Sequence, residues 1–286
     1  MSSATTTRRL AGKKGLATVL FYAFIVLIVL VSVLPLLWIF KMSVIPKSEL
    51  FASPPTIWPQ HFTADPWREI FSDPAFLGAI KNSAIISALT TVFCLLFGSM
   101  SAYAISRLQF DFKGSVLTLI LAISFFPGVA IIGPLFKQFS ELHLINTYWA
   151  AIVADTVFSL PLTVWLLVAF FKELPSDLED AAKVDGATTI QALYKVVIPL
   201  AAPGVATTAI LTFIYAWNEF LFANTFLLTQ NTQTLTVVIP NFATVHTVDY
   251  GAQAAATVVA TVPLVFLVLF FQRRIVSGLT AGAVKG

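Results

Sequence analysis

Long stretches without charged side chains constrain the fold of this chain more than any other feature of its sequence. Residues 16–40 contain no Asp, Glu, Lys or Arg, and five further stretches contain at most one each. These five cover residues 82–106, 115–136, 148–171, 204–228 and 252–271. A helix of about 20 residues, rising about 1.5 Å per residue, crosses the roughly 30 Å hydrocarbon core of a bilayer. The sequence therefore predicts an all-α integral membrane protein with six transmembrane helices.

The composition excludes a soluble globular domain. Apolar residues make up 58% of the chain, charged residues make up 11%, and the mean hydropathy is +0.87, whereas soluble domains carry about 25% charged residues. In a membrane protein the 17 Lys and Arg residues report orientation, so the pI near 9.0 is not a sign of nucleic-acid binding.

The basic residues predict the orientation of the chain. With six crossings, 12 of the 17 fall on the side that holds both termini, and the positive-inside rule makes that side the cytoplasm. These 12 are Arg8, Arg9, Lys13, Lys14, Arg107, Lys113, Lys172, Lys183, Lys195, Arg273, Arg274 and Lys285. The remaining five, on the outer side, are Lys41, Lys47, Arg68, Lys81 and Lys137.

The termini flank one predicted membrane domain over residues 16–271. Residues 1–15 are polar and basic without apolar periodicity, which predicts a disordered cytoplasmic tail, and residues 272–286 form a Gly-containing cytoplasmic tail. A signal peptide is the alternative at the N-terminus. The run at 16–40 is too long for a signal peptide's apolar core and lacks a small-residue cleavage site, so we expect a retained helix.

Two predicted outer segments differ in character. Residues 41–81 hold six prolines, and a short helix is expected near residues 67–71. Residues 229–251 hold no Lys or Arg, one acid and many amide and hydroxyl side chains.

The segment 174–199 is the only long polar segment between the apolar runs, and it predicts two short helices joined by a sharp elbow. Ser176 and Glu179 form a capping-box pair, so the first helix is expected to begin at Asp177. Gly186 is expected to end it in the left-handed conformation, which costs glycine little.

A second capping-box pair, Thr188 with Gln191, predicts that the chain restarts a helix, which runs toward Ile198 and stops before Pro199. No His or Cys lies near the acids of this elbow, so it carries no sign of a metal site or nucleophile. A solvated connecting loop is the plain alternative.

The elbow resembles a known signature. Residues 178–187, LEDAAKVDGA, followed by KVVIP at 195–199, look like the cytoplasmic coupling loop of the membrane subunits of ABC importers. That family's pattern is Glu-Ala-Ala, three residues, Gly, nine residues, then an apolar residue two positions before a Leu-Pro pair. It falls here on Asp180, Ala181, Ala182, Gly186, Val196, Ile198 and Pro199. The acid is shortened to Asp180 and the Leu is replaced by Ile198.

The resemblance implies the type I ABC importer transmembrane fold, with a cytoplasmic coupling helix between the fourth and fifth membrane helices that docks into a cleft of a partner ATPase. The coupling residues it implies are Leu178, Glu179, Asp180, Ala181, Ala182, Asp185, Gly186 and Ala187.

Two acids, Asp155 and Glu219, lie inside predicted membrane helices. Because a charge in hydrocarbon is costly unless it faces a cavity or a partner, both are candidates to line a substrate path; capping or bridging of helices is the alternative. Trp217, Asn218 and Glu219 belong to the sequence WNEF, which resembles a motif of carbohydrate-importing members of the family. An aromatic face beside amide and carboxylate groups suits a sugar, and a helix–helix contact is the alternative.

The C-terminal residues, QRRIVSGLTAGAVKG, are similar to the tail of permease subunits of maltose- and trehalose-type importers. In that group one of two unlike permeases carries a Gly-rich tail that reaches the interface of the ATPase dimer. The resemblance implies such a contact through Gly278, Gly282 and Lys285, and a frayed C-terminus is the alternative.

The resemblance also implies what the protein is expected to do. It implies the permease subunit of an ATP-driven importer of a di- or oligosaccharide such as trehalose or maltose, in the plasma membrane of a prokaryote. The implied partners are a second, unlike permease, an ATPase dimer, an extracytoplasmic sugar-binding protein and membrane lipid. The chain is not expected to be an enzyme or to hold a cofactor or metal, because it has no phosphate-binding Gly-rich loop; ATP and Mg²⁺ belong to the ATPases.

Three alternatives remain at this point. The chain could be a permease for another solute such as glycerol phosphate, or an ion-coupled secondary transporter that uses Asp155 or Glu219. A membrane enzyme is disfavoured, because His61, His143 and His246 lie in outer segments far apart in the sequence.

Overall fold

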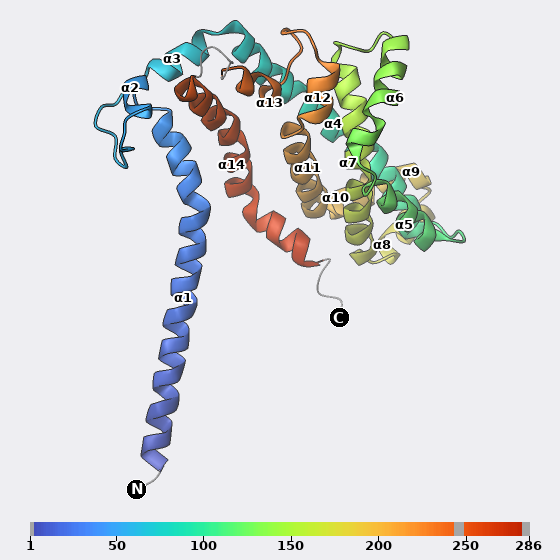
Figure 1. Ribbon diagram of the computed structural model, residues 1–286. Helices are drawn as coiled ribbons and strands as arrows, with labels where there is room; N and C mark the ends of the chain where they lie inside the picture. Colours follow the sequence, from blue (N-terminus) through green and yellow to red (C-terminus); the bar gives the residue numbers. More distant parts are fainter. Residues whose placement is uncertain (1–2, 243–248, 282–286) are drawn as a thin grey trace.

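The computed structural model describes the backbone of residues 3–242 and 249–281 and the side chains of residues 18–242 and 249–272. Within these residues the chain is helical and has no strand, which confirms the all-α prediction (Figure 1). The helices are α1 (Ser3–Met42), α2 (Lys47–Leu50), α3 (Asp65–Ser72), α4 (Pro74–Arg107), α5 (Lys113–Ile123), α6 (Gly128–Glu141), α7 (Tyr148–Glu173), α8 (Asp177–Val184), α9 (Thr189–Ala192), the π-helix η1 (Leu193–Val197), α10 (Ile198–Leu200), α11 (Ala202–Trp217), α12 (Leu221–Phe226), α13 (Leu235–Val238), the 3₁₀-helix η2 (Ile239–Phe242) and α14 (Tyr250–Ala281).

Helices α4, α7 and α11 pack against one another at the centre of the molecule. A Cβ atom at Gly98 of α4 would lie 2.7 Å from Cγ2 of Thr163 in α7, and one at Gly204 of α11 would lie 2.3 Å from the Phe170 ring of α7. Inside a bilayer apolar side chains gain little by leaving lipid, so small residues that let helices approach closely contribute through van der Waals contact. These two glycines set the spacing of the central helices.

Four helices, α1, α4, α7 and α14, contain spans long and apolar enough to cross a membrane, or up to six spans exist if each of two bent pairs counts as one. Helices α5 and α6 meet at 84°, and the stretch Thr189–Leu200 meets α11 at 85°. The apolar run 115–136 is therefore not one straight helix, and the bend agrees with the expectation that the interior proline Pro127 kinks or ends a helix. Pro127 stands at the N-cap of α6, where its missing N–H cannot continue α5.

The continuous helix predicted over 204–228 is wrong, because α11 ends at Trp217. The Glu219 carboxylate accepts the backbone N–H groups of Phe222 at 2.8 Å and Ala223 at 2.9 Å. The first N–H groups of a helix have no partner within it, so an acceptor at this place favours the start of the separate helix α12.

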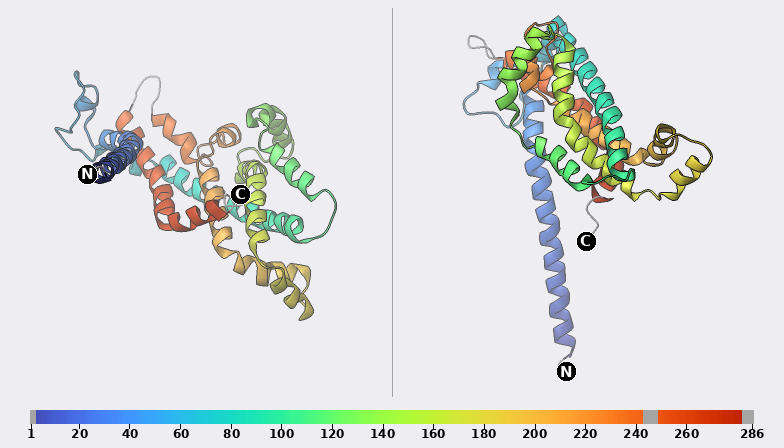
Figure 2. Two further views of the ribbon diagram at one scale, coloured as in Figure 1. Left: turned by 90° about the horizontal axis from the view of Figure 1, so that it is seen from below. Right: turned by 90° about the vertical axis from the view of Figure 1, so that its right-hand side faces the viewer.

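The N-terminal part of helix α1 stands apart from the other helices and extends beyond them, whereas its C-terminal end packs against α14 (Figures 1 and 2). None of the residues in its most apolar window is buried within the chain. Its backbone is helical from Ser3 onward, which differs from the disordered tail predicted for residues 1–15. Once a helix is nucleated, each added residue gains one hydrogen bond, and this favours extension of a long apolar helix into its polar flank.

The start of α14 is tied to α2 and α3. Asp249 accepts the N–H of Ala252 at 3.0 Å and pairs with Lys47 of α2, and the Glu69 carboxyl group of α3 lies close enough to interact with it. Burial and the neighbouring Asp249 carboxylate raise the pKa of Glu69. Helix α3 confirms the short helix predicted near residues 67–71.

Candidate functional site

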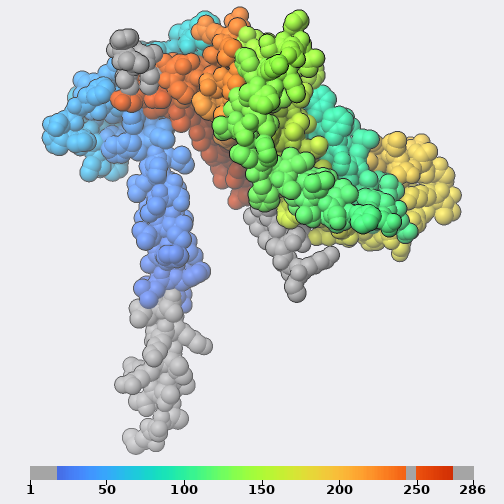
Figure 3. Space-filling view, turned by 45° about the vertical axis from the view of Figure 1, so that its right-hand side comes forward, coloured from blue at the N-terminus to red at the C-terminus, as the bar shows by residue number. Residues whose placement is uncertain are grey.

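The polar segment 174–199 forms an elbow that projects from the bundle (yellow in Figure 3). Helix α8 ends at a left-handed Gly186, with φ of 88°, as predicted. The N–H groups of Gly186 and Ala187 donate to the carbonyls of Lys183 and Ala182 at 3.0 and 2.9 Å. No atom lies within 4 Å of the place where a Cβ at Gly186 would stand. The backbone conformation, which costs other residues about 1–2 kcal/mol, is therefore what requires glycine here.

The second helix of the elbow begins at the predicted capping box. Thr188 Oγ1 accepts the N–H of Gln191 at 3.3 Å, and Gln191 Oε1 accepts the N–H of Thr188 at 2.9 Å. The predicted stop before Pro199 is wrong, because the π-helix η1 leads into α10, which contains Pro199. A proline leaves a helical carbonyl without its donor, and wider π-turns accommodate such interruptions.

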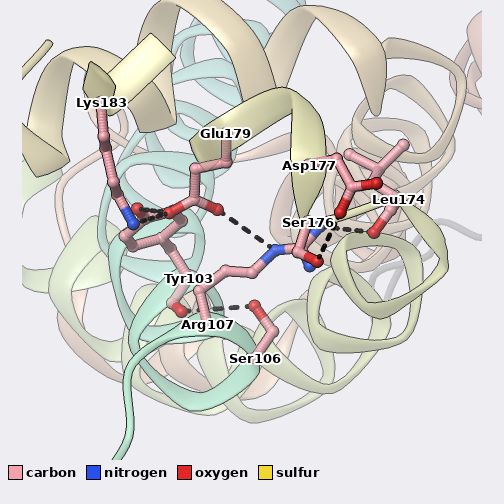
Figure 4. Close-up of polar contacts among 8 residues, drawn as sticks. All are labelled: Tyr103, Ser106, Arg107, Leu174, Ser176, Asp177, Glu179 and Lys183. Atoms are coloured by element: carbon pink, nitrogen blue, oxygen red, sulfur yellow. Dashed lines mark hydrogen bonds and ion pairs between the residues drawn. The ribbon is translucent and has the colours of Figure 1, made fainter. Parts of the chain in front are cut away.

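The predicted cap at the start of α8 is wrong. Ser176 has helical backbone angles and its side chain makes no capping hydrogen bond. Glu179 turns away from the backbone it was expected to cap and lies against the end of α4, where it is only 3% exposed (Figure 4). Partners from α4 compete successfully with the local cap because they are charged or hydroxylic and surround the carboxylate.

Glu179 joins helix α8 to α4. Its Oε1 accepts a hydrogen bond from the Tyr103 hydroxyl and lies 2.6 Å from Lys183 Nζ, and its Oε2 lies 3.4 Å from Arg107 Nε. Arg107 Nη2 also donates to the Leu174 carbonyl at 2.7 Å, just beyond α7 (Figure 4). We call Glu179, Tyr103, Arg107, Lys183 and the Leu174 carbonyl the Glu179 anchor.

The electrostatics of the anchor favour an ionised carboxylate. Burial alone raises the pKa of Glu179, but hydrogen bonds from Lys183 and Tyr103 and the charges of Lys183 and Arg107 outweigh it, so the pKa lies below its ordinary value. Charge-assisted hydrogen bonds are shorter and about twice as strong as neutral ones. The anchor is thus a compact ionic joint between α8 and α4.

The opposite side of the elbow faces outward. Leu178, Val184 and Ile190 are 47%, 87% and 64% exposed, although they are apolar. Of the other implied coupling residues, Asp180, Ala181, Asp185 and Gly186 are exposed, and Ala182 and Ala187 are partly buried. Exposed apolar side chains gathered on a polar projection are typical of a surface that binds another protein.

Asp155 of α7 is 1% exposed, and its Oδ1 has no hydrogen-bond partner among the residues whose side chains are described. The hydroxyls of Thr90 and Ser159 are also buried without a described partner. No group of three or more His, Cys, Asp and Glu residues in the described part of the chain could hold a metal ion. Asp155 is therefore a buried carboxyl group with unused hydrogen-bonding capacity.

The structure separates the residues of the WNEF motif. Trp217 is 5% exposed and its indole N–H donates to the Ala260 carbonyl at 3.0 Å, which is a contact between α11 and α14. Asn218 is exposed and donates to the Ile214 carbonyl at 2.7 Å. Glu219 caps α12, so each of the three side chains forms hydrogen bonds with backbone groups of this chain.

Three side chains of the anchor were missed by sequence reasoning. Arg107 and Lys183 were counted only as cytoplasmic charges, and Tyr103 of α4, four residues before Arg107, entered none of the predicted sites. This spacing at the end of an apolar run places Tyr103 and Arg107 on one face of α4, which is the signal that could have identified them. Of the predicted tail contacts, Gly278 lies in the backbone of α14, and Gly282 and Lys285 lie outside the described residues.

Comparisons with known proteins agree with the expected class of membrane transport subunit. The family model described as "Binding-protein-dependent transport system inner membrane component" matches residues 94–280. The chain is 43% identical over 262 residues to the trehalose transport system permease protein SugB of Mycobacterium tuberculosis, covering 91% of this chain and 95% of that protein. It is 38% identical over 264 residues to the trehalose/maltose transport system permease protein MalG of Thermococcus litoralis, covering 91% and 94%.

Among solved structures, the fold is similar to a chain of a bacterial ABC transporter involved in the import of alginate. The TM-score is 0.79 at 20% identity, and the match covers 91% of this chain and 97% of that one.

Proposed function

The chain belongs to the family of inner membrane components of binding-protein-dependent transport systems, and we propose that it imports a di- or oligosaccharide of the trehalose or maltose type. In this proposal it is the permease subunit of an ATP-driven importer. Partner ATPases bind ATP and Mg²⁺, and an extracytoplasmic protein delivers the sugar. The chain contributes the membrane path and the coupling element.

The observation that carries the proposal is the two-sided elbow. Its outer face presents Leu178 and Val184 to a partner, and its inner face holds Glu179 against α4. A displacement of α8 by closing ATPases is passed to α4 through the ionic contact with Arg107, and to the end of α7 through the Leu174 carbonyl. An element that is rigidly attached on one side and exposed on the other suits the transmission of a rigid-body motion.

The proposed topology has six crossings, with each bent pair counted as one, and both termini in the cytoplasm. The excess of Lys and Arg on the side of the elbow supports this orientation. We propose residues 16–271 as the permease domain with the coupling loop at 174–199. The flanking segments 1–15 and 272–286 are cytoplasmic, and Gly278, Gly282 and Lys285 contact the ATPases.

A second, unlike permease is proposed to cover α1. An apolar groove of about 420 Å³ runs between the end of α1, at Leu36 and Phe40, and α14, at Val262 and Phe266. With no residue of its apolar window buried, α1 has a large surface free for lipid and for another membrane subunit. Asp155, Asn218 and Glu219 are proposed to border the substrate path, where Asp155 has unused hydrogen-bonding capacity for a sugar hydroxyl.

Transport by the reconstituted complex tests the proposal. The chain is co-expressed with its partner subunits, purified through a tag on this chain, and placed in proteoliposomes that enclose ATP. We expect uptake of labelled trehalose or maltose that requires both the enclosed ATP and the external binding protein. Sugar uptake by this chain alone, driven by an ion gradient, would refute the importer.

The coupling role is tested separately by charge on the outer face of the elbow. We expect Val184→Asp to reduce the amount of ATPase that copurifies with the chain. The matched control is Ile57→Asp, because Ile57 is an exposed apolar residue, 77% exposed, in the segment between α2 and α3. Equal ATPase recovery with both variants would contradict docking at the elbow. It would not contradict the proposal that the complex transports sugar.

A further inference from the structure

The loop before α13 is fixed by side chains from two other helices and a turn. Asn82 Nδ2 of α4 donates to the carbonyls of Asn231 at 3.0 Å and Gln233 at 2.8 Å, and Tyr148 of α7 donates to Asn82 Oδ1 at 2.5 Å. Ser83 Oγ accepts the N–H of Leu235 at 2.9 Å. The backbone of this loop is therefore held at several points to the central helices.

A second clamp holds the beginning of the same loop. Asn146 has a left-handed backbone, with φ of 62°, and its Oδ1 accepts the N–H groups of Leu228 at 2.6 Å and Thr229 at 2.9 Å. Its own N–H donates to the Phe226 carbonyl at 2.8 Å. Because side-chain acceptors replace water on these backbone groups, the loop is preorganised and pays little further entropy on binding.

Beside this loop lies a pocket of about 210 Å³, and its lining combines four polar residues, two aliphatic residues and one aromatic ring. The lining residues are Asp73, Ala75, Gln230, Gln233, Val238, Asn241 and Phe242. Asp73 Oδ1 accepts the N–H of Ala75 at 2.9 Å and caps α4. Within the described lining, Asp73 is the one formal charge, and Gln230, Gln233 and Asn241 are the residues with amide side chains.

We infer that this pocket receives an arginine or lysine side chain of the extracytoplasmic binding protein. A carboxylate, three amide oxygens and an aromatic face are the groups that recognise a guanidinium or ammonium ion. The volume of about 210 Å³ has room for the head of one side chain. The inference rests on the proposed function for the existence and the side of this partner.

Charge removal at Asp73 tests the inference without removing the cap. The readout is ATP hydrolysis by the complete complex in proteoliposomes, measured against the concentration of sugar-loaded binding protein at low and high salt. We expect Asp73→Asn to raise the half-maximal concentration about three- to tenfold at low salt, since asparagine also caps helices but cannot pair with a cation. The salt dependence should become weaker in the variant, because salt screens the pair in the wild type.

Asp65→Asn is the matched control. It removes one negative charge from α3, where Asp65 is exposed and lies 3.5 Å from Arg68. We expect this variant to match the wild type. In a second variant, Gln233→Ala, we expect a higher half-maximal concentration with an unchanged salt dependence, because a neutral acceptor is lost.

Three outcomes would overturn the inference. They are an Asp73→Asn curve equal to wild type at both salt concentrations, an equal shift with Asp65→Asn, and a change in sugar affinity without a change in binding-protein affinity. The last would assign the pocket to the sugar. Failure of the binding protein to stimulate even the wild-type complex would instead contradict the proposed function.

Discussion

Replacement of Glu179 by glutamine probes the Glu179 anchor, because it preserves the shape of the side chain and removes its charge. The glutamine oxygen can still accept the Tyr103 hydroxyl. Its amide group, however, places a donor toward Arg107 Nε, where the carboxylate Oε2 lay 3.4 Å away. Arg107 keeps its hydrogen bond to the Leu174 carbonyl, so its charge is not left without a partner.

The magnitude follows from burial and partner type. The Glu179 side chain is 4% exposed and that of Arg107 is 12% exposed, so solvent screens this pair little. Lys183 is 39% exposed and contributes less, because solvent screens its charge. A hydrogen bond or ion pair to a buried charged group contributes about 1.5–3 kcal/mol, and each 1.4 kcal/mol changes an equilibrium about tenfold. We expect α8 to separate from α4 about ten to a hundred times more often in the variant.

Hydrogen exchange of the α8 amides in the assembled complex measures this separation, and the ratio of sugar transported to ATP hydrolysed measures coupling. Exchange should rise and the ratio should fall. Because the pKa of Glu179 is lowered, its stabilising effect is present above the ordinary value of 4.5 and lost only as the pH falls through the lowered pKa. The difference between variant and wild type should therefore be constant around neutral pH.

Two comparisons make the result specific. Glu173→Gln removes an exposed charge at the end of α7 and should leave exchange and coupling unchanged. In a double-mutant cycle, Arg107→Gln combined with Glu179→Gln should cost less than the two separate effects added together. Wild-type exchange and coupling in Glu179→Gln, or equal losses in Glu173→Gln, would refute the anchor.

Three further predictions follow from described contacts. Gly186→Ala should cost about 1–2 kcal/mol and weaken coupling, because alanine disfavours a φ of 88°. The control is Gly133→Ala in helix α6, where no neighbouring atom lies within 4 Å of the added Cβ. Equal thermal stability of the two variants would contradict the reasoning. The raised pKa of Glu69 means that its contribution to stability is present below the ordinary value of 4.5 and is lost as the pH rises through the raised pKa. Glu69→Gln should therefore flatten the pH dependence of the melting temperature of the complex above pH 4.5, and an unchanged profile would count against the pair with Asp249. Glu219→Gln keeps one acceptor for the two N–H groups of α12, so the sugar concentration for half-maximal uptake should rise about two- to twelvefold at every pH tested. If the variant accumulated no sugar while its ATPases stayed bound, ion coupling would be favoured instead.

The parts of the fold that depend on composition could be predicted from the sequence. Charge-free runs of membrane length predicted the long helices α1, α4, α7 and α14, since few alternatives satisfy the backbone in a bilayer. The breaks inside two of the runs could not be predicted in this way. A hydropathy window gives the same value for a straight helix and for an interrupted one. The proline itself signals the break at Pro127, whereas the break at Glu219 depends on individual hydrogen bonds.

The candidate site shows the same division. Gly186 and the Thr188 cap are local features, and both were predicted correctly because the residues that decide them are neighbours in sequence. Glu179 was assigned to a local cap, but its partner Tyr103 lies 76 residues earlier. A carboxylate with competing partners follows the stronger tertiary ones, and their positions are known only from the folded chain.

The isolation of α1 has a consequence for how the chain is assembled and how it tolerates change. Since no side chain of its apolar window is buried within the chain, exchanges of one apolar residue for another from Val19 to Leu34 should disturb the packing of this chain little. They alter its affinity for whatever lies beside it in the membrane. The proposed second subunit would cover this surface, so a copy of the chain that lacks it would leave the apolar side chains of α1 exposed to lipid.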